Sequence, residues 1–500
     1  MPNHLYDHLF APHADNAACF IMQDGADDLS YAAFVARAAQ IAHVLTDAGL
    51  APGDRVVVQA KKSVEMLLLY AATIQAGGVF LPLNTAYKRD EVAYFITDAE
   101  PKVLVCDPAS TDMLADLASD VGATLLTLDG NGRGSLTDPA PAKPTTFDTA
   151  ERSADDLAAL LYTSGTTGRS KGAMLSHANL LSNTEVLTEH WRITRSDTLI
   201  HALPIFHTHG LFVATNTSVL AGAKMRFMPG FDLDALIAAL PQATMLMGVP
   251  TFYTRLLGDD RLTADLTANM RLFVSGSAPL LAETHDAFTA RTGHHILERY
   301  GMTETNMNTS NPYDGDRRAG TVGLPLPGVE VVVTDPETGA PLPQGSVGMV
   351  EVRGPNVFQG YWRMPEKTAA EKRDTGFFIT GDLGQFSDDG YLSIVGRSKD
   401  LIITGGYNVY PKEIEDVLND LDSVSESAVF GVPDADFGEA IIAALVPMPG
   451  ATIDDDAIGA VVREKLARFK HPRRYAVMDE LPRNAMGKVQ KNVLRDSYAG

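Results

Sequence analysis

A loop rich in glycine and hydroxyl side chains follows an apolar run near residue 160. Residues 160–175 are LLYTSGTTGRSKGAML, so apolar segments flank the loop on both sides. Glycines and hydroxyls let several backbone N–H groups and Oγ atoms point at one anion, and Lys171 adds positive charge. The composition therefore indicates a phosphate-binding loop. It is not a Walker A loop, because Lys171 is followed by Gly172 instead of Ser or Thr; a flexible loop without a ligand has a similar composition.

A second group of residues that could do chemistry is the histidine pair in IFHTHG. His207 and His209 are two residues apart, and His201 lies upstream. Zinc binding is one interpretation, but no nearby cysteine or acid has recognisable ligand spacing. We therefore favour a hydrogen-bonded core histidine for His209.

Alternating helix and strand patterns must position these groups. Residues 54–60 and 101–107 predict buried strands, and the segment from Ser30 to Gly49 predicts an amphipathic helix with apolar residues three or four apart. The apolar segment from Met66 is interrupted by Gly77, Gly78 and Pro82, which predicts a buried helix, a glycine stop and a strand instead of a membrane span. Such alternation is typical of parallel sheets covered by helices.

Size and charge restrict the classes of protein. Five hundred residues with 45% hydrophobic content predict two or three domains. The formal net charge of −22 argues against nucleic acid or an anionic membrane as a partner. The N-terminal segment does not resemble a secretion signal, and Cys19 and Cys106 form no disulfide or redox motif. We expect a cytoplasmic protein, either a monomer or a homodimer.

The composition changes near residue 396. Pro411 begins a predicted helix whose apolar residues share one face, and strands, a further helix and a Gly-Lys turn follow. A proline- and alanine-rich stretch at 138–145 predicts a surface linker. We expect a large unit over residues 1–398 and a small α+β unit over residues 399–500.

Five motifs occur in the order found in the adenylate-forming superfamily. YTSGTTGRSKG at 162–172, RYGMTET at 299–305, TGD at 380–382, GRSKD at 396–400 and PRNAMGK at 482–488 together resemble that superfamily, which includes acyl-CoA synthetases. Over essentially its full length the chain most resembles the malonyl-CoA synthetases. The resemblance implies a large α/β domain of layered sheets and helices and a small mobile C-terminal lid.

The implied reaction has two steps, formation of an acyl-adenylate from ATP and transfer of the acyl group to coenzyme A. Mg²⁺ is implied as cofactor, with Thr166 and Glu304 matching its ligands, because carboxylate and triphosphate repel each other until cations neutralise them. The implied ATP-binding residues are Thr163, Ser164, Gly165, Thr166, Thr167, Gly168, Lys171, Gly276, Ser277, Ala278, Glu298, Tyr300, Gly301, Met302, Thr303, Asp382, Arg397 and Lys488.

Lys488 matches the catalytic lysine of the superfamily. Position in the motif outweighs the alternative of a solvated lysine, which the basic sequence GKVQKNVLR by itself favours. By the same resemblance Lys399 is the hinge, Gly405, Gly406 and Tyr407 line the coenzyme A channel, and the catalytic residues are Lys488, His207 and Glu304.

Arg299 suggests which acid is used. A guanidinium facing the acyl pocket would be unpaired with acetate or a fatty chain but would form a bidentate ion pair with a second carboxylate. An ion pair with Glu298 or an internal acid is the alternative. The residues implied at the substrate carboxylates are Arg299, His207, Ser277 and Arg255.

Three hypotheses follow. A malonate–CoA ligase that also accepts methylmalonate is the first, and a ligase for short monocarboxylates or an enzyme that loads a separate carrier is the second. The third is a nucleotide-binding regulator without catalysis, which the presence of both Glu304 and Lys488 disfavours.

Overall fold

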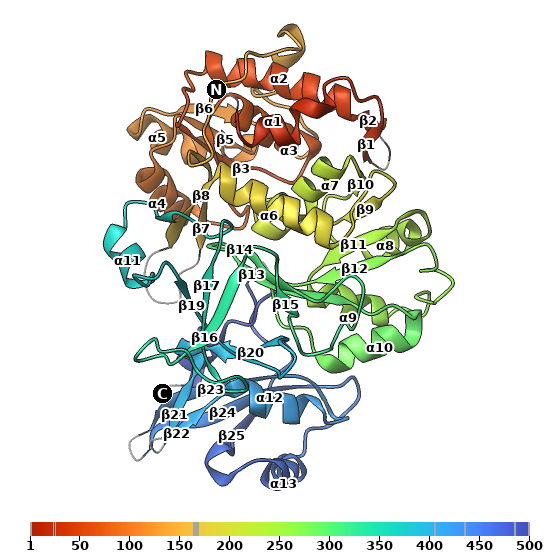
Figure 1. Cartoon of the computed structure of the whole chain (residues 1–500), viewed down its shortest axis with the longest axis vertical. Helices are drawn as coiled ribbons and strands as arrows, with labels where there is room; N and C mark the ends of the chain where they lie inside the picture. Colours follow the sequence, from red (N-terminus) through yellow and green to blue (C-terminus); the bar gives the residue numbers. More distant parts are fainter. Residues whose placement is uncertain are drawn as a thin grey trace.

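The computed structural model covers nearly the whole chain. The described residues are 3–23, 25, 27–163, 170–404, 407–434, 437–484 and 487–498. They form four β-sheets with helices packed against them, and the sheet formed last in the sequence lies at one end of the molecule (Figure 1). The α/β class predicted from the alternating pattern is confirmed.

The first sheet has a parallel centre and comes mainly from the N-terminal third of the chain. Its order is β18-β8-β7-β4-β3-β5-β6, and β8 is antiparallel to both of its neighbours, β7 and β18. The predicted strands at 54–60 and 101–107 are β3 and β5, whose apolar residues are buried on both faces, as parallel strands require. The strands are β3 (Arg55–Gln59), β4 (Val79–Pro82), β5 (Val103–Cys106), β6 (Thr124–Thr127), β7 (Leu157–Thr163), β8 (Lys171–Ser176) and β18 (Gly360–Tyr361).

The second sheet has the order β15-β14-β13-β12-β11-β9-β10-β1-β2. Its central strands are parallel, and the outer strands β2, β14 and β15 are antiparallel to their neighbours. The strands are β1 (Cys19–Met22), β2 (Leu29–Ser30), β9 (Thr198–His201), β10 (Lys224–Phe227), β11 (Met245–Gly248), β12 (Leu272–Ser275), β13 (Leu297–Met302), β14 (Asn306–Ser310) and β15 (Leu324–Pro325).

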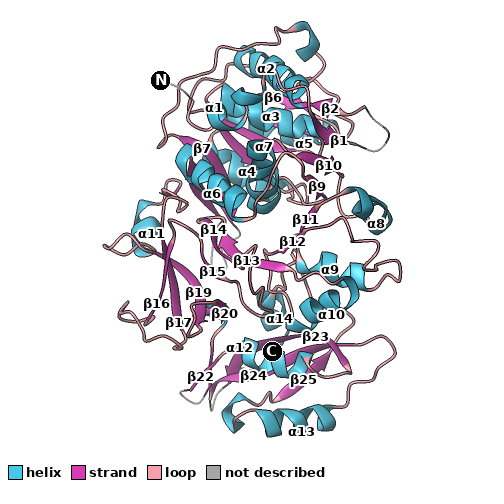
Figure 2. Cartoon of the chain, turned by 45° about the vertical axis from the view of Figure 1, so that its right-hand side comes forward, coloured by secondary structure: helices cyan, strands magenta, loops and turns pink. Residues whose placement is uncertain are grey.

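Helices cover these two sheets (Figure 2). They are α1 (Tyr6–Leu9), α2 (Tyr31–Asp47), α3 (Val64–Gln75), α4 (Arg89–Ala99), α5 (Thr111–Asp120), α6 (His177–His190), α7 (Asn216–Ala221), α8 (Leu233–Ala239), α9 (Pro250–Leu257) and α10 (Ala282–Thr292). A π-helical segment, His209–Thr215, precedes α7.

Local sequence explains α2 and α3. The Ser30 side chain accepts a hydrogen bond from the Ala33 N–H and caps the start of α2. Helix α3 is buried along its length, and the chain turns at Gly77, with φ of 77°, into β4. The predicted sequence of buried helix, glycine stop and strand is confirmed.

An antiparallel third sheet connects the large part of the chain to its end. Its order is β16-β17-β19-β20, and α11 (Pro365–Ala370) lies between its second and third strands in the sequence. The strands are β16 (Glu330–Thr334), β17 (Gly348–Arg353), β19 (Phe378–Phe386) and β20 (Leu392–Arg397).

The C-terminal unit, residues 402–498, is built on the fourth sheet. Its path is β22-β21-β24-β23, with β25 pairing with β24. One apolar cluster packs α12 and α13 against a face of this sheet, and another packs α14 against Phe430 and Leu481. The elements are β21 (Ile402–Thr404), β22 (Tyr407–Val409), α12 (Pro411–Asn419), β23 (Val424–Asp434), β24 (Gly438–Pro447), α13 (Asp455–Lys465), β25 (Arg474–Val477) and α14 (Lys491–Tyr498).

The stretch at 138–145 lies mostly at the surface, as predicted, with only Ala140 buried. A 3₁₀ turn, Ala140–Ala142, lies within it, and the Gln40 side chain of α2 donates to the Lys143 carbonyl at 3.0 Å. This hydrogen bond holds the segment against α2. The prolines restrict its backbone, and its carbonyls still accept hydrogen bonds.

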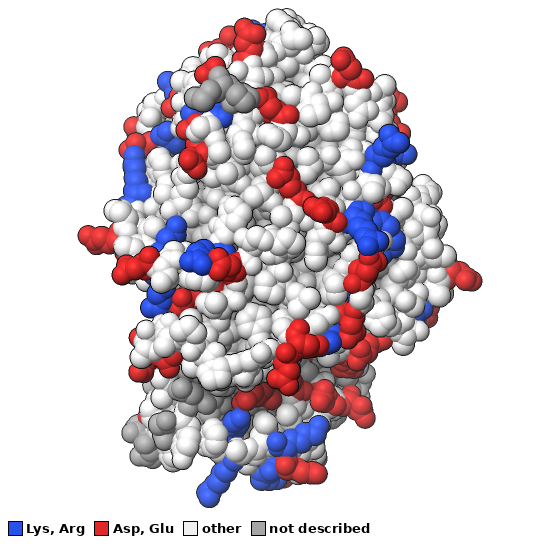
Figure 3. Space-filling view, in the orientation of Figure 1, with Lys and Arg blue, Asp and Glu red and all other residues white. Residues whose placement is uncertain are grey.

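The outer surface carries acidic and basic side chains that are interspersed on the face shown in Figure 3, with no broad basic patch there. Within the described ranges, no helix is both long enough and apolar enough to cross a membrane.

Candidate active site

The predicted site residues meet where parallel strands of the second sheet end. His207 and His209 follow β9, and Gly276 to Ala278 follow β12. Arg299 is the third residue of β13, directly after the part of the strand that pairs in parallel with β12. Because β9, β11, β12 and β13 are parallel neighbours, their carboxyl ends lie at one edge of the sheet. Ligands of open α/β sheets bind at this edge.

Arg299 is buried, with 4% of its surface exposed, and its Nε and Nη2 have no hydrogen-bond partner. A Cβ placed on Gly276 would lie 2.4 Å from the Arg299 Cζ, so the guanidinium occupies the space that this glycine leaves. Burial lowers the pKa of Arg299 to about 9, so the guanidinium stays mainly protonated at neutral pH. The predicted alternative of an ion pair with Glu298 is not formed. An unpaired buried charge destabilises the folded protein by several kcal/mol, and an anionic ligand would offset this cost.

Two histidines and a serine lie beside Arg299. Burial, followed by the charges of Lys488 and Arg299, lowers the pKa of His207 to about 3. His209 is fully buried; burial and Arg299 lower its pKa, its Nδ1 lies 3.3 Å from the Ser277 Oγ, and its Nε2 has no partner. Ser277 has a φ of 71°, a conformation that non-glycine residues rarely adopt and that is concentrated at functional sites.

These four residues, Arg299, His207, His209 and Ser277, form a cluster whose unpaired donors suit an anion, and we call this cluster the anion-binding pocket. In the described part of the chain, no carboxylate is among the groups that shift the pKa values of Arg299, His207 and His209. The imidazoles are neutral, so the fixed charge of the pocket comes from the guanidinium. A ligand carboxylate would satisfy donors that the protein leaves unpaired.

A second cluster joins β13 to the third sheet. The Tyr300 hydroxyl donates to Asp382 Oδ2 at 2.5 Å, and Arg397 Nε lies 2.7 Å from Asp382 Oδ1. Asp382 and Arg397 face each other across β19 and β20, and the carboxylate raises the pKa of Arg397. Tyr300 and Arg299 are consecutive strand residues and therefore serve opposite faces of β13.

Lys488 extends from the C-terminal unit toward both clusters. Burial and the charge of Arg397 lower its pKa, while Asp382 and Glu304 act in the opposite direction. The Lys488 charge also lowers the pKa of His207. Lys488 is exposed, and it lies near β19, β20 and the turn after β13, although about ninety residues separate it from Arg397 at the end of β20.

Glu304 is buried and belongs to a network of polar groups. Its Oε1 lies 3.0 Å from the Tyr361 hydroxyl, and the same hydroxyl lies 2.6 Å from Glu371 Oε2. Lys171 Nζ lies 3.2 Å from Glu371 Oε1 and 4.2 Å from the centre of the Tyr361 ring. The positive charge predicted for a phosphate is therefore held by Glu371 in this structure.

Several predicted nucleotide-binding residues lie near these clusters and are described by their backbone position and burial. Gly301 is required by the tight β13–β14 turn, where an added Cβ would lie 1.8 Å from the Asn306 oxygen. Ala278, Met302 and Thr303 are half-buried at the strand ends. Thr163 pairs with Lys171 across β7 and β8. The residues of the loop between those strands fall outside the described residues: Ser164, Gly165, Thr166, Thr167 and Gly168.

Other predicted residues lie away from the anion-binding pocket. Arg255 is exposed on α9, and its guanidinium lies 5.1 Å from the Phe231 ring centre. Tyr407 is 56% exposed and stacks on Phe469 at 4.6 Å on the surface of the C-terminal unit. Gly405 and Gly406 fall outside the described residues. Lys399 is exposed in the 3₁₀ turn Ser398–Asp400.

Glu298 is buried beside Arg299 in the sequence, and its Oε1 has no hydrogen-bond partner. The backbone of Gly320 and Leu280 favours the ionised form of its carboxyl, but burial has the larger effect. Burial raises its pKa from 4.5 to about 8. The contact of Glu298 with ATP stays a prediction.

We expect Glu298→Gln to change how stability depends on pH. Between pH 4.5 and about 8 the folded protein keeps a proton that the unfolded chain releases, so the free energy of unfolding falls as pH rises through that window. A neutral glutamine lacks this term. The variant's melting temperature should therefore improve relative to wild type from about pH 5 to about pH 9, measured by thermal unfolding; a difference independent of pH would contradict the assignment.

Sequence reasoning missed the groups that support the predicted ones. Tyr361 and Glu371 lie outside the recognised motifs, and Lys62 contacts His201 at 3.1 Å from the other large sheet. Their residue types gave no signal, since each acts through a partner far away in the sequence.

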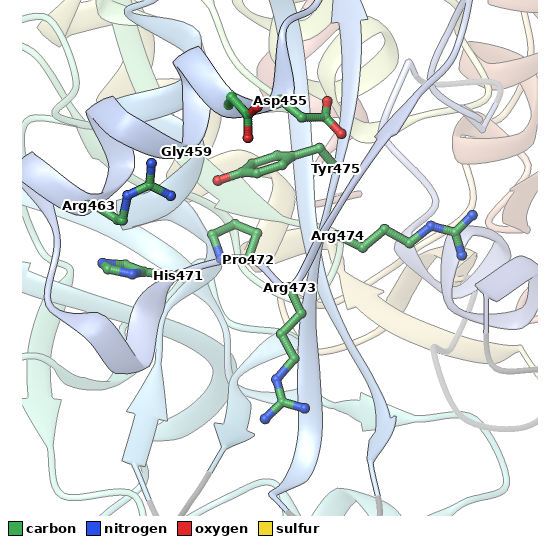
Figure 4. Close-up of a pocket in the computed structure, with 9 residues that line it drawn as sticks. Asp455, Gly459, Arg463, His471, Pro472, Arg473, Arg474 and Tyr475 are labelled. Atoms are coloured by element: carbon green, nitrogen blue, oxygen red, sulfur yellow. The ribbon is translucent and has the colours of Figure 1, made fainter.

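A surface pocket of about 340 Å³ lies in the C-terminal unit, between α13 and β25 (Figure 4). Asp455 and Asp456 line it together with Arg463 and Arg474, and Arg473 is ion-paired with Asp434 at 2.8 Å. Acids and bases are mixed there, so the pocket lacks the uniform charge of the anion-binding pocket.

Comparisons with known proteins agree with this fold. The family described as AMP-binding enzyme matches residues 9–362, and AMP-binding enzyme C-terminal domain matches residues 413–488. The crystal structure of ATP-bound MatB from Rhodopseudomonas palustris is 60% identical, with a TM-score of 0.98 over 100% of this chain and 99% of that one. The apo form of the same protein covers the same shares at a TM-score of 0.87. Malonate–CoA ligase of Arabidopsis thaliana is 34% identical over 90% of this chain and 79% of that protein.

The layered sheets, the small C-terminal unit and the charged site between them define an adenylate-forming protein. The chain belongs to the AMP-binding enzyme family.

Proposed function

We propose that this protein is an AMP-forming acid–thiol ligase that joins malonate to coenzyme A and also accepts methylmalonate. The buried, unpaired guanidinium of Arg299 carries the proposal, because a monocarboxylate would leave it unsatisfied. The similarity to MatB and to a malonate–CoA ligase supports the same substrate.

In the first step one malonate carboxylate attacks the α-phosphorus of ATP. An acyl–oxygen–phosphorus bond forms, the bond to the β-phosphate oxygen breaks, and pyrophosphate leaves. Lys488 stabilises the charge shared by the attacking carboxylate and the phosphate, and His207 orients that carboxylate. Asp382 binds the ribose hydroxyls, Arg397 contacts ribose or phosphate, and Arg299 with Ser277 holds the distal carboxylate. Arg255 would join them only after its side chain leaves Phe231.

In the second step the thiol of coenzyme A attacks the acyl carbon. A thioester bond forms, the acyl–oxygen bond breaks, and AMP leaves. We propose that residues 399–500 rotate about a hinge near Lys399 against residues 1–398, which brings Gly405, Gly406 and Tyr407 to the site as the thiol channel. The exposed ring of Tyr407 would then become covered.

The separate packing of the C-terminal unit supports such a rotation. Its two apolar clusters are made within the unit, and only the short turn Ser398–Asp400 joins β20 to β21. The TM-score is 0.98 against ATP-bound MatB and 0.87 against the apo form. The two forms therefore differ in shape, and this chain resembles the ATP-bound one more.

We propose Mg²⁺ as cofactor, with Glu304 and Thr166 as ligands. A buried carboxylate next to a tyrosine hydroxyl fits a hard cation that keeps most of its waters. Within the described ranges, no group of three His, Cys, Asp or Glu is arranged to hold a metal. In the proposed site, waters and phosphate oxygens complete the coordination by Glu304 and Thr166. Bound Mg²⁺ would neutralise phosphate charge.

The two cysteines are free thiols, and we place the enzyme in the reducing cytoplasm as a monomer or homodimer.

Exchange of labelled pyrophosphate into ATP tests the function. We expect exchange with malonate, weaker exchange with methylmalonate, and little with acetate or butyrate. Preference for butyrate would favour the monocarboxylate ligase, and absence of exchange with every acid would favour the regulator.

Gly276→Ala is expected to lower kcat/KM for malonate by about 100-fold, because misplacing a substrate-binding group by about 1 Å costs that much. The new methyl would lie 2.4 Å from Arg299 Cζ and displace the guanidinium. Gly258→Ala is the matched control, since its Cβ would meet nothing closer than 3.5 Å. Equal kcat/KM values in the two variants would contradict binding of malonate by Arg299.

A further inference from the structure

Lys62 reaches from the loop after β3 to the end of β9 in the other large sheet. Its Nζ donates to the His201 carbonyl at 2.8 Å and lies 3.1 Å from His201 Nδ1. The Phe227 ring centre is 4.3 Å from the same Nζ, on the strand next to β9. Neither the motifs nor the proposed mechanism uses this lysine.

The contact with Lys62 determines which nitrogen of His201 carries the proton. Burial lowers the pKa of His201 well below its usual value, so the ring is neutral and has one N–H. Burial also lowers the pKa of Lys62, but an amine in either protonation state has N–H groups to donate. Nδ1 faces the Lys62 donor and therefore accepts. Nε2 then carries the proton and donates to the Gly210 carbonyl at 2.9 Å, with Thr215 Oγ1 3.1 Å away.

Gly210 is the second residue of the π-helical segment His209–Thr215. The Thr215 hydroxyl also donates to the Gly210 carbonyl, at 2.9 Å. A Cβ on Gly210 would lie 2.0 Å from the Pro204 oxygen, so the turn is closely packed. π-Helical turns are frequent at functional sites, and their uneven backbone pairing needs support.

The supported turn begins with a residue of the anion-binding pocket. His209 precedes Gly210. Its Nδ1 lies 3.3 Å from the Ser277 Oγ, and the charge of Arg299 lowers its pKa. Moving the Gly210 carbonyl would therefore move the His209 ring relative to Arg299. Lys62 is connected to the pocket by two consecutive hydrogen bonds.

We propose that Lys62 is a positioning residue for the acyl pocket, acting through the His201 imidazole and the Gly210 carbonyl on the turn that holds His209 opposite Arg299. This inference rests on the proposed function, since the effect is expected on the acid substrate. Without Lys62, the His201 Nδ1 and carbonyl lose their donor and the proton can move to Nδ1. The Gly210 carbonyl then loses the imidazole donor and keeps only the Thr215 hydroxyl as a side-chain donor.

Steady-state kinetics of Lys62→Met tests the inference. We expect KM for malonate to rise about 10-fold, as for loss of a buried hydrogen bond, while KM for ATP changes by less than about twofold. Lys61→Met is the control, because Lys61 is the exposed neighbour with the same charge. Thermal unfolding of each variant identifies loss of fold.

A double-mutant cycle with His201→Gln supplies a measurement that a general loss of packing would not change. The glutamine amide can donate to Gly210 without needing Lys62 to set a tautomer. Lys62→Met should then cost less than about threefold in the His201→Gln background, because residues of one hydrogen-bond network are not additive. Lys62→Gln, which keeps a donor, replaces Lys62→Met if that variant does not fold.

Equal rises in both KM values, or the same effect in both backgrounds, would overturn the inference. A wild-type enzyme without malonate-dependent exchange would instead refute the proposed substrate. In that case the same cycle, run with the acid that wild type does use, still decides the role of Lys62.

Discussion

Lys488→Ala is expected to abolish adenylation while thioester formation from supplied malonyl-adenylate continues. Lys488 is the cation that the C-terminal unit directs toward Asp382, Glu304 and His207. It acts on the charge of the attacked phosphate, and removing such a group costs about 10³-fold or more. In the second step the bond between the carboxylate and the phosphate has already formed, so no repulsion between them remains for the lysine to offset. The two half-reactions are measured separately, by pyrophosphate exchange and by release of AMP from the supplied adenylate.

Lys465→Ala is the control for Lys488→Ala. Lys465 belongs to the same C-terminal unit and lies 3.9 Å from Asp420, remote from the site. We expect wild-type rates from it in both half-reactions. Equal loss of both half-reactions in Lys488→Ala would contradict a role confined to adenylation.

Arg299→Met is expected to lower kcat/KM for malonate by roughly 10⁴-fold, the discrimination available to a site built for a polar group. The substitution preserves volume but removes the fixed charge, so the distal carboxylate would be buried without a counter-ion. Activity with butyrate should not fall, because its methyl end needs no guanidinium. The ratio of kcat/KM for malonate to that for butyrate is the decisive measurement.

Two further arginines calibrate that result. Arg37→Met removes an exposed charge that pairs with Glu65 on the far helices and should leave kinetics unchanged. Arg255→Met tests whether the exposed arginine over Phe231 moves to bind malonate during turnover. A wild-type malonate to butyrate ratio in Arg299→Met would remove the dicarboxylate proposal.

The local elements of this fold follow from short stretches of sequence. The helix from Ser30, the buried helix before Gly77 and the strands at 54–60 and 101–107 occur where the sequence predicts them. Each depends on spacing, capping or a turn residue within a few positions, so neighbouring residues suffice to determine it. Ordered motifs also suffice for the family, because five matches over more than three hundred residues leave little room for coincidence.

The partners of the charged groups were decided by the tertiary structure. Lys171 and Glu371 are 200 residues apart, and Lys62 and His201 are 139 apart. The sequence predicts that Lys171 and Arg299 are cations, but only the packed sheets place Glu371 beside one and leave the other without an acid. The same packing leaves Arg255 exposed on α9 and brings Lys62 into contact with His201. The type of a residue determines the chemistry that its side chain can do. The long-range packing of strand ends determines which partner that side chain contacts.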